Sequence, residues 1–205
     1  MKLKYLAILI LLVVAGCVSK TMKMDKVEEG HWKAKALIRD KEQSRSYIVN
    51  LNFNLVRGQR TRMDVTSALN TGVASLVTDG KEVRYLMFDS KRFYYGRPQP
   101  DVMRPILSIP IDPRWIENML LDQAIPDKSW SCTSNSKSVV EECKDSVSGL
   151  TITWSQRLGH KKTIIIDHSK ATVQINVQTF KAKVEDRKNL FVLEAPEGYQ
   201  KLQVR

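Results

Sequence analysis

Apolar and polar residues alternate along most of this chain, which predicts a half-buried β-sheet. From Trp32 to Arg39 every second residue is apolar, and over 47–55 five apolar residues share one face while three asparagines share the other. Gly58 and Asp79-Gly80 mark tight turns between such stretches. Further strand-like stretches are expected at 62–65, 73–77, 83–88, 92–95, 130–132, 150–154, 163–166, 173–177, 191–193 and 202–204.

A Pro-rich segment interrupts this alternation. Five of the seven prolines fall between Pro98 and Pro113. Asp112-Pro113 is typical of a helix start, and the residues after it repeat at helical spacing, with Trp115, Ile116, Met119 and Leu120 on one face. We therefore expect a short helical insert over 100–121, which we call the lid segment.

These patterns predict an α+β protein that is mostly β. A sheet of about ten strands does not stay flat in water, so we expect a single curled antiparallel sheet, an incomplete β-barrel, over 30–205. The lid segment would cover its hollow face and leave an apolar cavity. The expected lining is Met63, Met87, Met103, Ile106, Trp115, Ile116, Met119 and Leu120. The alternative for each is an ordinary core position.

The N-terminus carries an export signal. Lys2 and Lys4 precede an apolar run, and Val14-Ala15-Gly16-Cys17 resembles a bacterial lipobox. The resemblance implies removal of residues 1–16, with a diacylglycerol and an N-acyl group on Cys17 and no other cofactor. The alternative is an uncleaved membrane anchor, which the length of the run does not favour, because it is about twelve residues and a span needs roughly twenty. Residues 17–29 are then a polar tether with a reach of ~40 Å.

The chain is basic, with a formal net charge of +11, of which the signal peptide contributes Lys2 and Lys4. A basic exported protein can meet anionic lipid or acidic proteins, and export excludes nucleic acid as a partner. The alternative is that the charge serves only solubility.

Two cysteines remain, in a compartment that permits disulfides. A hairpin folded about Lys137–Ser138 places Cys132 opposite Cys143, so we predict a bridge worth about 3 kcal/mol. The alternatives are two free thiols or a metal pair, although no further ligand lies at metal spacing.

The sequence does not favour an enzyme. Asp167-His168-Ser169 has the residue types of a catalytic triad, but neighbours on an extended chain point to opposite faces. There is no Gly-x-Ser-x-Gly motif, and His31, His160 and His168 match no metal-binding spacing. We interpret Asp167–Ser169 as a turn between strands.

Several of these features together resemble the LolA/LolB lipoprotein-carrier family. They are the lipobox, the stretch Trp32–Arg39, the hairpins of Arg60–Tyr95, the Pro-rich lid segment and the closing Pro196-Glu197-Gly198-Tyr199. Because this chain has Cys17, it is closer to LolB, the outer-membrane receptor of the family. It departs from the family in one respect, since residues 18–31 give little sign of the usual first helix.

The resemblance implies a monomeric, outer-membrane-anchored lipoprotein on the periplasmic side. It would accept acylated lipoproteins from a soluble periplasmic carrier and insert them into the outer membrane. Val18, where an inner-membrane lipoprotein has Asp, agrees with that location. Leu69, alone among the small and polar residues of 66–72, is the expected membrane-insertion residue, unless it folds inward and closes the end of the sheet.

Two other functions remain open from the sequence. The cavity suits free lipid or glycolipid as well as protein-linked acyl chains, because a fold does not determine a function. A structural or docking lipoprotein with a closed cavity and no protein cargo is the other alternative.

Overall fold

The computed structural model describes residues 22–204, so the predicted signal peptide and Cys17 lie outside the described residues. One sheet of twelve strands forms the body, in the order β12-β6-β5-β4-β3-β2-β1-β11-β10-β9-β8-β7. All pairs are antiparallel except β12 with β6. The strands are β1 Glu29–Asp40, β2 Arg45–Val56, β3 Arg60–Ser67, β4 Gly72–Thr78, β5 Val83–Met87, β6 Arg92–Gly96, β7 Trp130–Ser134, β8 Val140–Asp145, β9 Thr151–Leu158, β10 Lys161–Asp167, β11 Ala171–Lys181 and β12 Gln200–Val204.

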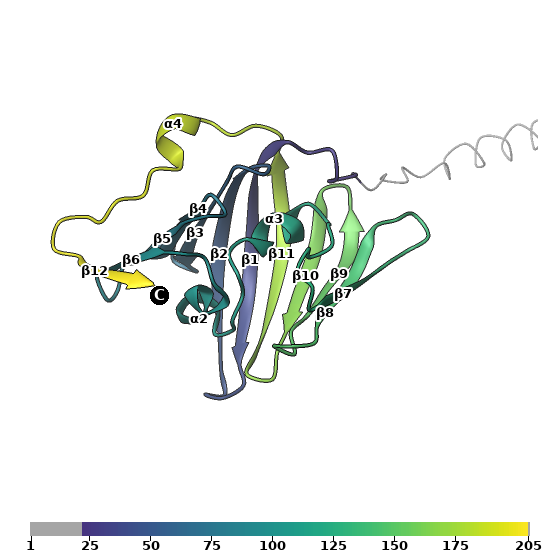
Figure 1. The fold of residues 1–205 in the computed structure, drawn as a ribbon, viewed down its shortest axis with the longest axis horizontal. Coiled ribbons are helices and arrows are strands. Elements are labelled where there is room, and N and C mark those ends of the chain that lie inside the picture. Colours follow the sequence, from purple (N-terminus) through teal and green to yellow (C-terminus); the bar gives the residue numbers. More distant parts are fainter. Residues whose placement is uncertain (1–21, 205) are drawn as a thin grey trace, which may run out of the picture.

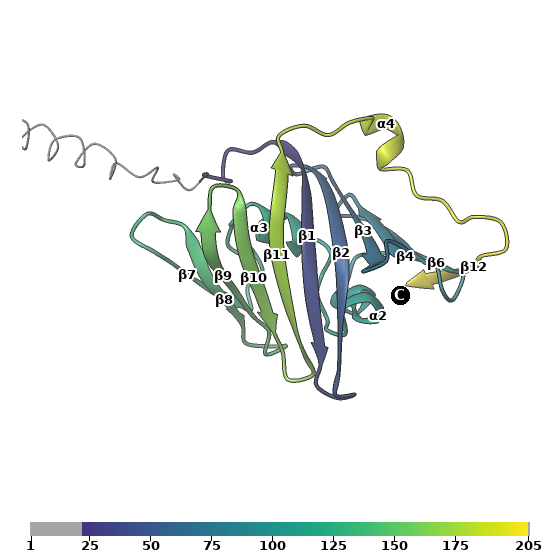
Figure 2. The ribbon, with the colours of Figure 1, turned by 180° about the vertical axis from the view of Figure 1, so that it is seen from behind.

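The helices are short and lie outside the sheet. The 3-10 helix η1 (Pro100–Met103), α2 (Arg104–Leu107) and α3 (Trp115–Leu120) belong to the lid segment, and α4 is Arg187–Leu190. Figure 1 shows α2 and α3 in front of the sheet, and Figure 2 shows them behind it, so the lid segment covers one face. After β11 the chain forms α4 and then pairs at the far end of the sheet as β12.

Burial follows the predicted alternation. On β1, Trp32 and every second residue to Ile38 are buried, and β2 buries Val49, Leu51, Phe53 and Leu55 on the same face. The predicted parity change near Phe180 is real, because Lys33 pairs with Thr179 and Ala34 pairs with Val177. Gln178 is therefore an extra residue on β11, which lets the strand bend.

Two hydrophobic clusters occupy the two faces of the sheet. The large one lies between the sheet and the lid segment, and it includes Trp32, Leu51 and Ile116. The small one lies on the opposite face, which we call the outer face, where Phe191 and Leu193 pack on Val77 and Phe93.

The predicted tether is too long. Met24 and Val27 are only 3% and 8% exposed and belong to the large cluster, and the Met22 N–H donates to Gly159 O at 3.1 Å. No helix forms over 22–28, as the sequence indicated. The last residues of 17–29 therefore pack on the body because two apolar side chains, three positions apart, reach the core.

Two further expectations differ from the structure. The sheet has twelve strands instead of about ten. Residues 191–193 form no strand, although Phe191 and Leu193 are apolar at period two. They lie in the segment 182–199, which contains α4 and no strand and which we call the strap, and they are buried because the strap crosses the outer face.

Candidate functional site

The interface between the lid segment and the sheet is the predicted cargo site. Besides two of its prolines and Asp112, eleven apolar side chains of the lid segment are buried there: Val102, Met103, Ile106, Leu107, Ile109, Ile111, Trp115, Ile116, Met119, Leu120 and Leu121. Trp115, Ile116, Met119 and Leu120 lie on one side of α3 at helical spacing, which explains why α3 directs one face at the sheet. The interface is therefore apolar on both sides.

The interior is packed, which corrects the expectation of a hollow. The space left between lid segment and sheet is about 10 Å³, room for about one water molecule. Its twelve lining residues are all apolar: Leu51, Phe53, Met63, Met103, Leu107, Ile111, Ile116, Met119, Leu120, Ile164, Ile166 and Ile175. Of the predicted lining, Met87, Ile106 and Trp115 are buried nearby but do not border this space.

Few polar contacts attach the lid segment along its length. The Gly58 N–H donates to both carboxylate oxygens of Glu117, at 3.0 and 3.2 Å. The Asp112 carboxylate accepts the Arg114 backbone N–H at 2.9 Å, which caps the turn that leads into α3. The Trp115 indole N–H donates to Asp127 at 2.6 Å. These contacts orient α3 at its first turn and leave its last turn to a separate cluster.

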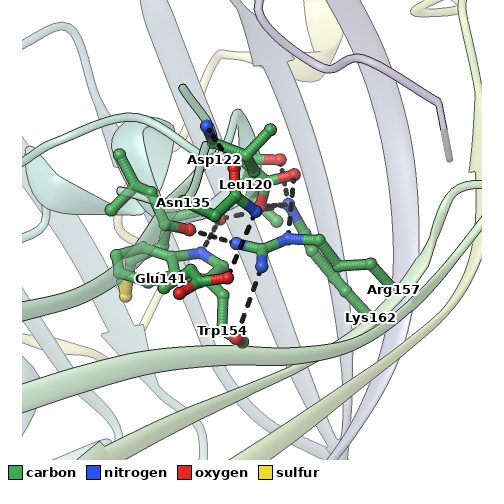
Figure 3. A network of polar contacts seen from close by, with 10 residues as sticks. Leu120, Asp122, Asn135, Glu141, Trp154, Arg157 and Lys162 are labelled. Carbon is green, nitrogen blue, oxygen red and sulfur yellow. Dashed lines mark hydrogen bonds and ion pairs between the residues drawn. The ribbon is translucent and has the colours of Figure 1, made fainter. Parts of the chain in front are cut away.

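A buried lysine holds the last turn of α3. The Lys162 ammonium donates to Leu120 O at 2.5 Å and Met119 O at 3.2 Å, and it pairs with Asp122 at 2.7 Å (Figure 3). The side chain of Lys162 is 2% exposed and that of Asp122 10%. A cation is well placed here because the final carbonyls of a helix lack partners within it.

Burial lowers the pKa of Lys162 below its usual 10.5, and the Asp122 carboxylate opposes this by favouring the ammonium form. Arg157 also approaches Asp122, with Nε 3.9 Å from the carboxylate, and its guanidinium donates to the carbonyls of Trp154 and Val140. The Trp154 indole N–H donates to Met119 O at 3.0 Å. The cluster thus joins α3 to β8, β9 and β10.

Sequence reasoning missed this cluster, although a signal was present. Lys162 has the same parity as Ile164 and Ile166, which the alternation places on the buried face. A lysine on the apolar face of a strand indicates a paired, buried charge.

Leu69 lies at an exposed loop tip, so the alternative in which it folds inward does not hold. Its side chain is 89% exposed, between β3 and β4. The Ser67 hydroxyl accepts the Leu69 and Thr71 N–H groups, both at 3.2 Å, and the Asn50 amide donates to Asn70 Oδ1 at 3.2 Å. The turn is therefore ordered by its polar residues while the leucine projects from it.

The remaining predicted sites have structural positions. Cys132 and Cys143 face each other on β7 and β8 and form a disulfide, as predicted. Asp167 ends β10, and the His168 ring accepts the Lys170 N–H at 3.2 Å within the turn to β11.

Across residues 22–204, no group of three or more His, Cys, Asp or Glu side chains could hold a metal ion. No helix in that range is long and apolar enough to cross a membrane.

Comparison with known proteins identifies the fold and no closer relation. No protein-family model matches the chain, and no curated protein matches its sequence. A putative outer membrane lipoprotein-sorting protein domain from Vibrio parahaemolyticus aligns with a TM-score of 0.42 and 10% identity, over 82% of this chain and 91% of that one. A LolA superfamily protein from Nitrosomonas europaea aligns with a TM-score of 0.54 and 12% identity, over 82% of this chain and 93% of that chain. By its structure, this chain has a LolA-like fold.

Proposed function

We propose that this chain is an envelope lipoprotein that receives the acyl chains of other lipoproteins between its lid segment and its sheet, and releases them into the outer membrane in the manner of LolB. The observation that carries the proposal is the apolar interface between the lid segment and the sheet, in a LolA-like fold. Cargo would be donated by a soluble periplasmic carrier.

Because the interior is packed, cargo has to replace the lid segment. Exposing its eleven buried side chains at roughly 2 kcal/mol each costs on the order of 20 kcal/mol. That exceeds the stability of about 5–15 kcal/mol of an ordinary domain, so the segment does not open into water. An acyl chain gains ~0.8 kcal/mol per buried methylene, so two or three chains compensate for its displacement.

The lid segment is built so that it can rearrange. Its two α-helices have four and six residues, and helices this short depend on packing for their stability. None of its residues takes part in the strand pairing of the sheet. Displacing the segment therefore leaves the hydrogen bonds between strands intact.

Leu69 fits the release step. A single leucine at an ordered, exposed tip can enter the acyl boundary of a bilayer without unfolding the sheet. The predicted acylation of Cys17 would keep the body near that bilayer.

The experiment uses the full chain reconstituted in phosphatidylcholine vesicles. A fluorescent triacylated peptide is offered on serum albumin, and its transfer to the vesicles is followed by dequenching. We expect faster transfer than to protein-free vesicles, with faster hydrogen exchange over 100–121 while the peptide is bound. No peptide binding, and unchanged exchange in the lid segment, would refute the proposal.

One observation favours a second function. The filled interior, with about 10 Å³ of free space, suits a structural or docking lipoprotein that carries no cargo. In the same assay that function predicts neither binding nor transfer. Binding of a free diacyl lipid in place of the triacylated peptide would instead identify a lipid carrier.

A further inference from the structure

A second concave site lies on the outer face, away from the lid segment. It is an open groove of about 1150 Å³ between the strap and the ends of β5, β6 and β12. Phe93 and Tyr95 of β6 and Lys201 and Gln203 of β12 line it, and Leu193 to Ala195 of the strap border it. Phe93 belongs to the outer cluster, so the groove and the lid segment occupy opposite faces.

Cations predominate around the groove. Lys81, Arg84, Arg97 and Lys201 line it, against two carboxylates, Glu82 and Glu194. Arg84 is paired with Glu82 at 3.3 Å. The side chains of Lys81, Arg97 and Lys201 make no ion pair or hydrogen bond with any residue of the described range 22–204. Three cations around one concavity complement an anionic ligand.

The walls also offer unpaired main chain. β12 is the end strand of the sheet, so one of its edges pairs with no other described strand. Across the groove, the backbone groups of Leu193, Glu194 and Ala195 make no hydrogen bond with the rest of the described chain. The regular spacing of N–H and C=O groups along such an edge matches the backbone of an extended peptide. A phosphate or a sugar has no matching row of donors and acceptors.

The aromatic side chains add an apolar surface. The rings of Phe93 and Tyr95 are stacked with centroids 6.1 Å apart, and Tyr95 is 41% exposed. An extended peptide presents alternate side chains to opposite sides, so one set can contact the rings while acidic residues meet the cations.

We propose that this groove binds an extended, acidic segment of a partner protein. The proposal is independent of cargo transport, because the groove shares no residue with the interface beneath the lid segment. It assigns a role to part of the basic charge that the sequence shows.

The test uses the full chain in phosphatidylcholine nanodiscs and a fluorescein-labelled peptide of six Glu-Thr repeats. We expect saturable binding by fluorescence anisotropy that weakens as salt is raised, and slower hydrogen exchange in β12 and at 193–195. The variant Lys81→Glu/Lys201→Glu should raise the dissociation constant about tenfold or more.

The matched control is Lys33→Glu/Lys35→Glu. These two exposed lysines of β1 do not line the groove, and their replacement changes net charge by the same amount. It should leave binding within about twofold of the unmodified chain. Equal loss in both variants, tighter binding of a Lys-Thr peptide, or equal binding of inorganic polyphosphate with the same dependence on Lys81 and Lys201 would each overturn the assignment. The assignment would also be overturned if anionic phosphatidylglycerol vesicles bound through the groove and the peptide did not.

Discussion

Replacing Lys162 by methionine tests whether the buried cluster attaches α3 to the sheet. Methionine keeps most of the length of the side chain and removes the cation. The Leu120 and Met119 carbonyls and the Asp122 carboxylate then lose bonds of 2.5, 3.2 and 2.7 Å. The change leaves a carboxylate that is 10% exposed without its closest partner.

The expected loss of stability follows from these contacts. Removing one partner of a buried ion pair costs about 3–5 kcal/mol. Arg157, with Nε at 3.9 Å from Asp122, compensates in part, so we expect about 3 kcal/mol. In a domain of this size that lowers the melting temperature by roughly 6–12 °C.

The assay is urea and thermal unfolding of the full chain in neutral detergent, read by tryptophan fluorescence. Lys161→Met is the control, because the neighbouring lysine is exposed and its ammonium forms no hydrogen bond or ion pair within residues 22–204, and it should cost less than about 0.5 kcal/mol. Asp122→Asn combined with Lys162→Met should destabilise less than the sum of the two single changes, by about 1–3 kcal/mol.

Hydrogen exchange separates a local role from a global one. Relative to the unmodified chain, we expect Lys162→Met to speed hydrogen exchange in α3 and to leave exchange in β1 and β11 unchanged. The helix end loses its attachment while the strand pairing remains. Unchanged stability, or equal losses in Lys161→Met and Lys162→Met, would refute the assigned role of the cluster.

Three further predictions concern other parts of the molecule. Leu69→Glu should slow transfer of the triacylated peptide to vesicles at least several-fold and spare its binding, whereas Val147→Glu, at another turn and 83% exposed, should change neither; equal effects would remove the special role of Leu69. Cys132→Ser/Cys143→Ser opens a loop of sequence separation 11, which should cost about 3 kcal/mol and lower the melting temperature without loss of binding; an unchanged melting temperature would contradict the bridge. Burial raises the pKa of Asp145, but hydrogen bonds from Ser148 and Ser129 and from the backbone at 147 and 148 outweigh it and hold the pKa below 3.8. Asp145 therefore stabilises the fold above about pH 4 and loses this contribution as pH falls through its folded-state pKa. Asp145→Asn should make the free energy of unfolding depend less steeply on pH below about pH 4. An unaltered pH dependence there would show that other groups produce it.

The sheet and the lid segment could be predicted because burial imposes a period on the sequence. Period two marked β1 and β2, and helical spacing after Asp112 marked α3. The disulfide followed from the register of one hairpin, in which Cys132 pairs with Cys143. The same parity argument, applied to Lys162, would have indicated its burial.

Other features depend on contacts between distant parts of the chain. The parallel pairing of β12 with β6 and the packing of the strap on the outer face leave no local pattern. Phe191 and Leu193 have strand periodicity but no partner strand, so packing prevails over local preference. How tightly the lid segment fills the interior depends on side-chain volumes on many elements at once, which a sequence pattern does not give.

The burial of Met24 and Val27 limits how far the body can travel from its anchor. If Cys17 is acylated, the linker between the lipid anchor and the folded body is only the five chain steps from Cys17 to Met22, which span at most about 17 Å. The edge of the protein at Gly159, which Met22 contacts, then stays within about 17 Å of the lipid-bearing Cys17. A soluble donor would therefore have to diffuse to the membrane surface to bind this protein, because the linker is too short for the folded body to reach far into the periplasm.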